Sequence, residues 1–159
     1  MKSLHKITSE SRENNAFKEG GIQMANQELL DLIIEAMKDE RHDAKKYCKM
    51  LKMTNNPTIR SQIRFAFEDE KIHYKLFRRL YFELTGKHIN IPTPPVKLAK
   101  TLIANVKTSI DGELAAVELY RKIYTMLSKT SQRDVLFRII TDEQEHATRF
   151  VYVYAILTP

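Results

Sequence analysis

The chain has 159 residues, a formal net charge of +6 at pH 7 and one cysteine, a length that suits one domain with a sizeable core. The single cysteine excludes an intrachain disulfide and any site built from several cysteine ligands, such as a rubredoxin site, a zinc ribbon or a self-contained iron–sulfur cluster. The single cysteine is consistent with a reducing compartment, so we expect a cytoplasmic protein. Basic residues are scattered among acidic ones, which argues against nucleic-acid binding, and the longest apolar run, residues 150–157, is too short to cross a membrane.

The predicted elements are a polar leading segment and four long helices. Residues 1–23 have no apolar stretch and are expected to form a polar lead that Gly20 and Gly21 close, with disorder left open. A helical domain is expected over residues 24–159. Asn55 and Asn56 before Pro57, and residues 128–131, are predicted capping signals. No segment alternates with period two, so the fold class is all-α. The predicted helices cover residues 27–53, residues 57–84, a stretch that starts after residues 88–96 and ends near residue 128, and residues 131–157.

The connection between the second and third helices is long and proline-rich. Residues 86–99 contain Pro92, Pro94 and Pro95, which favour an extended chain. A stretch of about 14 extended residues would let the third helix run parallel to the second. We favour this crossover, although a shorter antiparallel connection also fits the lengths.

An internal repeat relates the two halves of the chain. A shift of 73 positions places polar residues of the first half on identical residues of the second. The economical interpretation is two copies of a helical hairpin. Each hairpin has two glutamates equidistant from its turn, which brings them to the same height. The matched pairs are Glu40 with Glu113, Tyr47 with Tyr120, Asp69 with Asp142, Glu70 with Glu143 and His73 with His146.

Each of the four glutamates interrupts the apolar stripe of its helix, and the spacing of three residues puts each histidine on the same face as the preceding glutamate. A lone Glu-x-x-His pattern is usually a surface pair. Four buried carboxylates without partners would each cost several kcal/mol. Two divalent cations would balance the four charges. Oxygen and imidazole ligands suit iron or manganese better than structural zinc.

With these residues the chain resembles the ferritin-like di-iron carboxylate proteins, in particular the rubrerythrin-like branch. The resemblance covers residues 27–157 and is carried by the segments ERHDAKKY, DEKIH, GELAAVELY and DEQEH. It implies a ferritin-like four-helix bundle that holds two iron ions, or manganese in their place. It also implies that Glu70 and Glu143 bridge the metals, that Glu40 and Glu113 are terminal ligands, and that His73 and His146 bind one metal each.

Further residues are candidates for supporting roles. The resemblance pairs Asp69 with His146 and Asp142 with His73, because a metal-bound histidine normally donates its other N–H group to an acceptor; solvent-facing aspartates are the alternative. Tyr47 and Tyr120 follow Glu40 and Glu113 by two turns and are expected either to donate to those carboxylates or to pack in the core. Asp43, the repeat mate of Ala116, is a candidate additional ligand or a plain surface residue.

The leading functional hypothesis is an oxidoreductase that reacts with hydrogen peroxide or dioxygen and takes electrons from a separate donor such as a rubredoxin-like protein. A manganese-catalase-like dismutase is the close variant. The alternatives are a ferroxidase or iron-handling protein, and a metal-stabilised bundle without enzymatic activity. Typical rubrerythrins add a rubredoxin-type domain and an extra glutamate where this chain has Ala116, and this chain shows neither. We expect a homodimer and neither a nucleic acid nor a membrane as partner.

Overall fold

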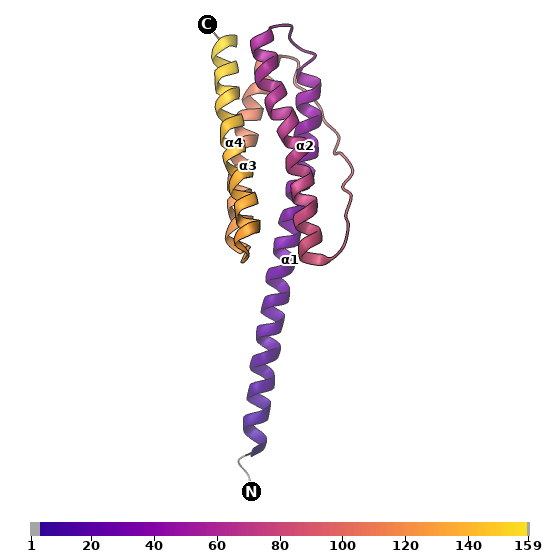
Figure 1. Cartoon of the computed structure of the whole chain (residues 1–159), viewed down its shortest axis with the longest axis vertical. Coiled ribbons are helices and arrows are strands. Elements are labelled where there is room, and N and C mark those ends of the chain that lie inside the picture. The colour runs from indigo at the N-terminus through magenta and orange to yellow at the C-terminus, as the bar shows by residue number, and fades with distance from the viewer. Residues whose placement is uncertain (1–3, 159) are drawn as a thin grey trace. The chain divides into compact units, whose positions relative to one another are not determined.

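The computed structural model describes the backbone of residues 4–158 and the side chains of residues 27–158. Four helices and no strand occur in this part of the chain, which confirms the predicted all-α class. The chain separates into two units, residues 1–31 and 32–159, and the second unit holds the bundle described below (Figure 1). The helices are α1 (Leu4–Met50), α2 (Pro57–Thr85), α3 (Leu102–Met126) and α4 (Thr130–Leu157).

Helix α1 begins much earlier than the sequence predicted. It starts at Leu4 instead of near residue 27, so the predicted boundary is wrong. Gly20 and Gly21 suggested a break, but a glycine costs only about 1 kcal/mol in a helix interior, which a long helix tolerates. The side chains of the predicted polar lead lie outside the described residues, and its separation from the bundle stays a prediction.

The helix ends follow local side-chain chemistry in part. Asn56 caps α2 as predicted: its side chain accepts hydrogen bonds from the amides of Thr58 and Ile59. Gly86 ends this helix with a φ of 68°, a conformation that glycine adopts without steric cost. The chain turns between α3 and α4 near residues 128–131, as predicted, but the predicted side-chain cap is wrong, because Lys129 occupies the N-cap of α4 and makes no side-chain capping bond.

The core of the bundle reproduces the internal repeat. Tyr47 packs against Phe150 with ring centroids 5.0 Å apart, and Phe77 packs against Tyr120 at 4.9 Å. Tyr47 and Tyr120 are repeat mates, and so are Phe77 and Phe150. All four side chains are almost completely buried. The two hairpins therefore pack through equivalent contacts, which places equivalent residues at equivalent heights.

Residues 86–101 connect α2 to α3 along the outside of the bundle, so that these two helices run in the same direction (Figure 1). Arg78 of α2 donates to the carbonyl of Ile89, and Lys49 of α1 donates to that of Val96 at 2.6 Å. Further on, Asn105 of α3 bonds both backbone groups of Ala99. Backbone groups that have no helical partner are thus bound by side chains of three helices. Over the described residues, no helix is long and apolar enough to cross a membrane.

Replacement of Asn56 by alanine removes the acceptor for two amides at the start of α2. We expect a loss of about 1 kcal/mol in the free energy of unfolding and a Tm that is lower by roughly 2–4 °C, measured by thermal unfolding monitored by circular dichroism. The neighbouring Asn55→Ala variant is the matched control, since Asn55 is exposed and caps nothing. Equal effects in the two variants would contradict the role of the cap.

Candidate metal centre

Six buried polar side chains meet inside the bundle. Each of the four helices contributes one glutamate, and α2 and α4 each add the histidine three residues further on. None of the six is more than 2% exposed. The sequence predicted this convergence, and the structure brings all six together; their role as metal ligands stays a prediction. They are Glu40, Glu70, His73, Glu113, Glu143 and His146.

The six residues form two overlapping groups. Glu40, Glu70, His73 and Glu143 make up one group, while Glu70, Glu143, Glu113 and His146 make up the other. Within each group, one ligand atom per residue lies within 4.8 Å of all the others. Two ligands on opposite sides of an ion at about 2.1 Å each are about 4.2 Å apart, so each group has the dimensions of a metal site. Glu70 and Glu143 belong to both.

The two imidazoles present the same nitrogen to the carboxylates. His73 Nδ1 lies 2.9 Å from Glu143 Oε1 and 3.5 Å from the nearer oxygens of Glu40 and Glu70. His146 Nδ1 lies 3.2 Å from Glu143 Oε2 and 3.3 Å from Glu70 Oε1. The rings are stacked with centroids 5.8 Å apart. The two Nδ1 atoms are therefore the candidate ligand atoms.

The other nitrogen of each imidazole contacts an aspartate of the opposite hairpin. His73 Nε2 donates to Asp142 Oδ2, and His146 Nε2 donates to Asp69 Oδ2, both at 3.2 Å. The predicted cross pairs are thus present. The hydrogen bond from His146 lowers the pKa of Asp69. A carboxylate that accepts from Nε2 fixes the ring orientation and keeps Nδ1 directed toward the glutamates.

The two tyrosines also bond across the bundle. Tyr47 donates to Glu113 Oε1, and Tyr120 donates to Glu40 Oε1 at 2.5 Å. The sequence left open core packing or bonds within one helix, from Tyr47 to Glu40 and from Tyr120 to Glu113. Both rings pack in the core, and the pairing within one helix is wrong. Residues seven apart on a helix are about 10.5 Å apart along its axis, whereas the repeat brings each tyrosine next to the glutamate of the other hairpin.

Burial and mutual repulsion make the negative charge of the four glutamates unfavourable unless protons or metal cations neutralise it. Burial, followed by repulsion from Glu70 and Glu143, raises the pKa of Glu40 well above its usual value, and burial does the same for Glu113. The pKa of Glu70 is raised for the same reasons, by burial and then by Glu143. Burial would also raise the pKa of Glu143, but the hydrogen bond from His146 and the close approach of the His73 imidazole lower it below its usual range.

For the two histidines, burial and the neighbouring carboxylates shift the pKa in opposite directions. Burial alone would lower the pKa of His73 and His146, but the surrounding carboxylates, first Asp142 for His73 and Asp69 for His146, raise both pKa values far above normal. The imidazoles therefore hold protons strongly in the absence of another cation. Positive charge at this point of the core is what the carboxylates require.

The donor set fits a pair of divalent metal ions. Four buried atoms have no hydrogen-bond partner among the described residues: Glu40 Oε2, Glu70 Oε1, His73 Nδ1 and Glu143 Oε1. A buried polar atom without a partner is costly, and all four point into the two groups. Two divalent ions would satisfy these atoms and would balance four carboxylates.

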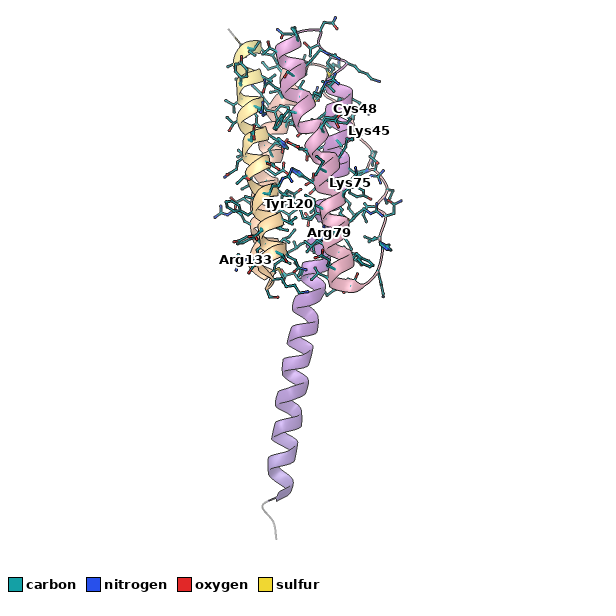
Figure 2. All side chains as sticks on the ribbon, in the orientation of Figure 1. Lys45, Cys48, Lys75, Arg79, Tyr120 and Arg133 are labelled. Carbon is teal, nitrogen blue, oxygen red and sulfur yellow. The ribbon has the colours of Figure 1, made fainter. Side chains whose placement is uncertain are left out.

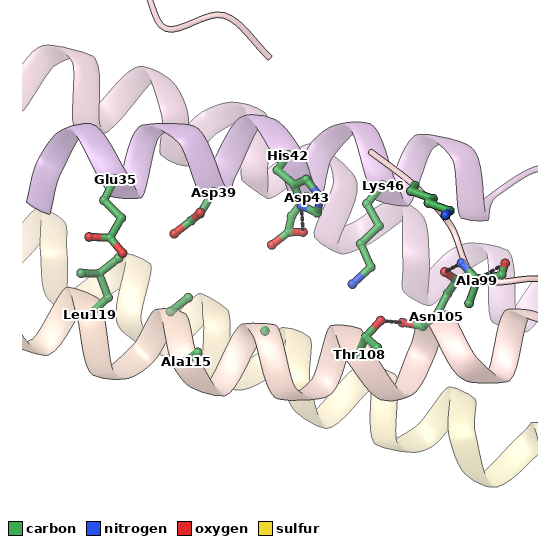
Figure 3. A pocket seen from close by; sticks show the side chains of 13 residues that line it. Glu35, Asp39, His42, Asp43, Lys46, Ala99, Asn105, Thr108, Ala115 and Leu119 are labelled. Carbon is green, nitrogen blue, oxygen red and sulfur yellow. Dashed lines mark hydrogen bonds and ion pairs between the residues drawn. The ribbon is translucent and has the colours of Figure 1, made fainter. Parts of the chain in front are cut away.

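Asp43, the candidate additional ligand, lies outside both groups. It accepts a hydrogen bond from His42 Nδ1 at 2.8 Å and borders a groove of about 600 Å³ between α1 and α3 (Figure 3). Ala116 borders the same groove. In Figure 3, Lys46 extends from α1 into this space. Burial, followed by repulsion from Asp43 and Glu35, raises the pKa of the neighbouring Asp39 to about 6. Lys97 also lines the groove, so acidic and basic side chains face each other there.

A second cavity, which the sequence did not indicate, lies between α1 and α2. Its volume is about 390 Å³, and its lining includes Glu40 and Glu70 of the cluster together with Cys48. Lys45 and Lys75, which also border it, are labelled with Cys48 in Figure 2. Residues on two helices and on the connection form this cavity, so no single sequence motif marks it.

Comparison with known proteins gives a family match and a curated relative. The model of the rubrerythrin family matches residues 2–81, half of the chain. The uncharacterized protein YhjR of Bacillus subtilis (strain 168) is 28% identical over 106 residues, which cover 67% of this chain and 72% of YhjR.

Solved structures confirm the ferritin-like bundle. A hypothetical protein from Pyrococcus furiosus matches with a TM-score of 0.73 and 21% identity over 81% of this chain and 89% of that one. A bacterioferritin from Desulfovibrio desulfuricans, described with its diiron site, matches with a TM-score of 0.69 and 18% identity over 82% of this chain and 80% of that one. Likeness at these identities establishes the fold.

We expect metal binding to release protons and to weaken as the pH falls. The raised pKa values of Glu40, Glu113 and the two histidines mean that protons occupy these atoms up to a higher pH than in the unfolded chain, so a divalent ion must displace them. Calorimetric titration with manganese(II) in buffers of different ionisation enthalpy measures the number released. A proton count of zero with an affinity independent of pH would contradict this electrostatic description.

Proposed function

Because the chain belongs to the rubrerythrin family and buries a cluster of four glutamates and two histidines, we propose that it is a di-iron or di-manganese carboxylate protein with oxidoreductase activity toward hydrogen peroxide or dioxygen. The observation that carries the proposal is the pair of four-residue groups that share Glu70 and Glu143. Shared carboxylates are what a site for two neighbouring ions requires.

In this proposal, Glu70 and Glu143 would help to hold both ions, and each remaining residue would help to hold one of them. Glu40 and His73 belong to one group, and Glu113 and His146 belong to the other. When bound, the ions would supply redox chemistry and Lewis acidity at the centre of the bundle. Residues of the chain supply the rest: position, charge balance and control of protons.

The hydrogen bonds around the cluster support that division of labour. Asp69 and Asp142 hold the Nε2 protons and keep each Nδ1 directed at the glutamates. The hydroxyls of Tyr47 and Tyr120 donate to Glu113 and Glu40, and burial raises the pKa of both tyrosines well above the usual value. Both hydroxyls therefore stay protonated and leave the second oxygen of each glutamate for an ion.

Reduction of hydrogen peroxide to water consumes two electrons and two protons. The chain has one cysteine, so it cannot itself hold an iron centre that needs several cysteine ligands. This supports a separate protein as the electron donor, such as a rubredoxin-like protein. We propose a homodimer as the working assembly, a point that sedimentation velocity tests directly.

The direct test of the function uses protein purified from its native host. Metal analysis is expected to find two iron or manganese ions per chain. Anaerobic reduction followed by addition of hydrogen peroxide or dioxygen is expected to change the optical spectrum in a stoichiometric reaction. A bound metal pair that reacts with neither oxidant would favour the non-enzymatic bundle instead.

Removal of either shared glutamate tests the ligand assignment. We expect Glu70→Ala or Glu143→Ala to lose bound metal, and to lower Tm only when it is compared with metal-loaded protein, since the metal-free variant lacks one buried carboxylate. Glu68→Ala is the matched control, because Glu68 is exposed and pairs with Lys71 at the surface. Two metals per chain in the Glu70 and Glu143 variants would refute the assignment.

Substitution of Asp69 and Asp142 tests whether they support metal binding by orienting His146 and His73. Asp69→Asn and Asp142→Asn keep the size of each side chain but remove the charge that faces an imidazole N–H group. We expect metal affinity to fall about 10- to 100-fold, measured by competition with a chelator. Asp134→Asn, an exposed change on the same helix as Asp142, should leave the affinity unchanged.

A further inference from the structure

We propose that the cavity between α1 and α2 is the access route to Glu40 and Glu70, and that its basic lining makes it a binding site for small inorganic anions. The inference rests on the proposed function, since it assigns a class of ligand to the same centre. It goes beyond that function because it concerns residues that are not metal ligands.

The inner end of the cavity reaches the cluster. Glu40 and Glu70 both border it, although they are only 1% and 2% exposed. Each also carries a carboxylate oxygen without a hydrogen-bond partner, Glu40 Oε2 and Glu70 Oε1. Ala44, one turn after Glu40, lines the same space with a single methyl group. A small species that enters this cavity therefore meets the carboxylates from outside the core.

The rest of the lining is strongly basic. Its four cationic residues are Arg41, Lys45, Lys71 and Lys75, and the only acidic residues in the lining are the two cluster glutamates.

Most of this positive charge has no acidic partner. Lys71 forms an ion pair with Glu68 at 2.6 Å. Arg41 donates to the neutral side chains of Thr93 and Tyr74. Within the described part of the chain, no carboxylate forms an ion pair with Lys45 or Lys75, and both are exposed.

The internal repeat shows that this charge is not imposed by the metal site. Every cluster residue of the first hairpin has an identical mate in the second, but no cationic residue of the cavity has a basic mate. The small residue changes as well, since Ala44 corresponds to Val117. The first hairpin therefore carries four positive charges at positions where the second hairpin has none. The mates of Arg41, Lys45, Lys71 and Lys75 are Leu114, Glu118, Gln144 and Thr148.

A concave surface of one charge sign concentrates small ions of the opposite sign. Once divalent ions balance the cluster glutamates, the remaining field of the cavity comes from its cationic lining. Anions are attracted to this opening and free divalent cations are repelled from it. The centre is thus accessible from this side to small anions such as azide or the hydroperoxide anion, and this side disfavours the delivery of Fe²⁺ as a substrate.

Cys48 provides a direct probe of the cavity. It is the only cysteine of the chain, it is partly exposed, and it lines the cavity together with Glu40 and Glu70. A methanethiosulfonate reagent transfers its alkylthio group to the Cys48 thiolate, which forms a mixed disulfide and releases methanesulfinate, so one defined residue reports the local potential. No modification of Cys48 is part of the proposal.

The experiment compares the rate constants of an anionic sulfonatoethyl reagent and a cationic trimethylammonioethyl reagent at Cys48, each divided by its rate constant with free mercaptoethanol. We expect the normalised anion-to-cation ratio to exceed about ten. The ratio should approach one at about 1 M salt, where the screening length is about 3 Å. A ratio near or below one at low salt would overturn the proposal. Failure of both reagents to react would also overturn it, because the cavity would then be closed.

Variants that remove positive charge test whether the cavity lysines cause the expected preference of Cys48 for the anionic reagent. In the Lys45→Gln/Lys75→Gln double variant, the ratio should fall several-fold. Lys87→Gln removes one charge beyond the end of α2 and should leave the ratio within twofold of the parent. Because both cavity lysines are exposed and form no ion pair with a described residue, the double variant is expected to fold normally, which the Tm verifies. An unchanged ratio in the double variant would refute the role of these residues.

A second readout uses azide with metal-loaded protein. We expect azide to change the optical spectrum with a Kd that rises about tenfold in the double variant, and to have no effect after Cys48 is blocked by N-ethylmaleimide. Protein that takes up no metal refutes the proposed function, while the Cys48 rate ratio still tests the cavity. Protein that takes up metal but gives a ratio of one, or binds azide equally after blocking, refutes the anion site alone.

Discussion

Four carboxylates at one level of an apolar core are the constraint on which the structure depends. An ionised group buried without a partner costs several kcal/mol, and repulsion among four such groups adds to this cost. Every polar contact around the cluster reduces it: the imidazoles approach the glutamates, Asp69 and Asp142 support the imidazoles, and the tyrosine hydroxyls donate to the remaining oxygens. The arrangement still leaves buried atoms without partners, and these define where cations belong.

Twofold repetition is what made this part of the molecule predictable from sequence. A single Glu-x-x-His pattern carries little information, but identical residues 73 positions apart at matched heights in two hairpins leave few alternatives. Helices α2 and α4 and the Asn56 cap were predicted from periodicity and turn chemistry alone. The cross pairs of aspartate and histidine came from the family resemblance, and the hydrogen bonds of His73 and His146 have that arrangement.

The wrong and missing predictions concern features that depend on packing between helices or on small energetic costs within one helix. Tyr47 was assigned to Glu40 because helical periodicity describes neighbours along one helix, whereas its partner Glu113 lies on another helix that only the packing brings near. The start of α1 was misplaced because two glycines weaken a helix without ending it. The basic cavity was missed because its residues come from α1, α2 and the connection. Its cationic residues also have no basic mates in the second hairpin, so the repeat does not reveal them.

Helix α1 borders two hollows with different charged linings. Asp39 and Asp43 are four residues apart and border the groove between α1 and α3, where Lys46 and Lys97 accompany them, while Arg41 and Lys45, two positions further on, border the basic cavity. Two residues correspond to about 200° around a helix, so the two pairs point in nearly opposite directions. The groove between α1 and α3 has none of the six cluster residues in its lining, whereas the basic cavity includes Glu40 and Glu70. In the proposed di-metal protein, the positively charged opening onto Glu40 and Glu70 repels divalent cations. The residues that hold the metal in the core are therefore different from the residues that control which small molecules reach it.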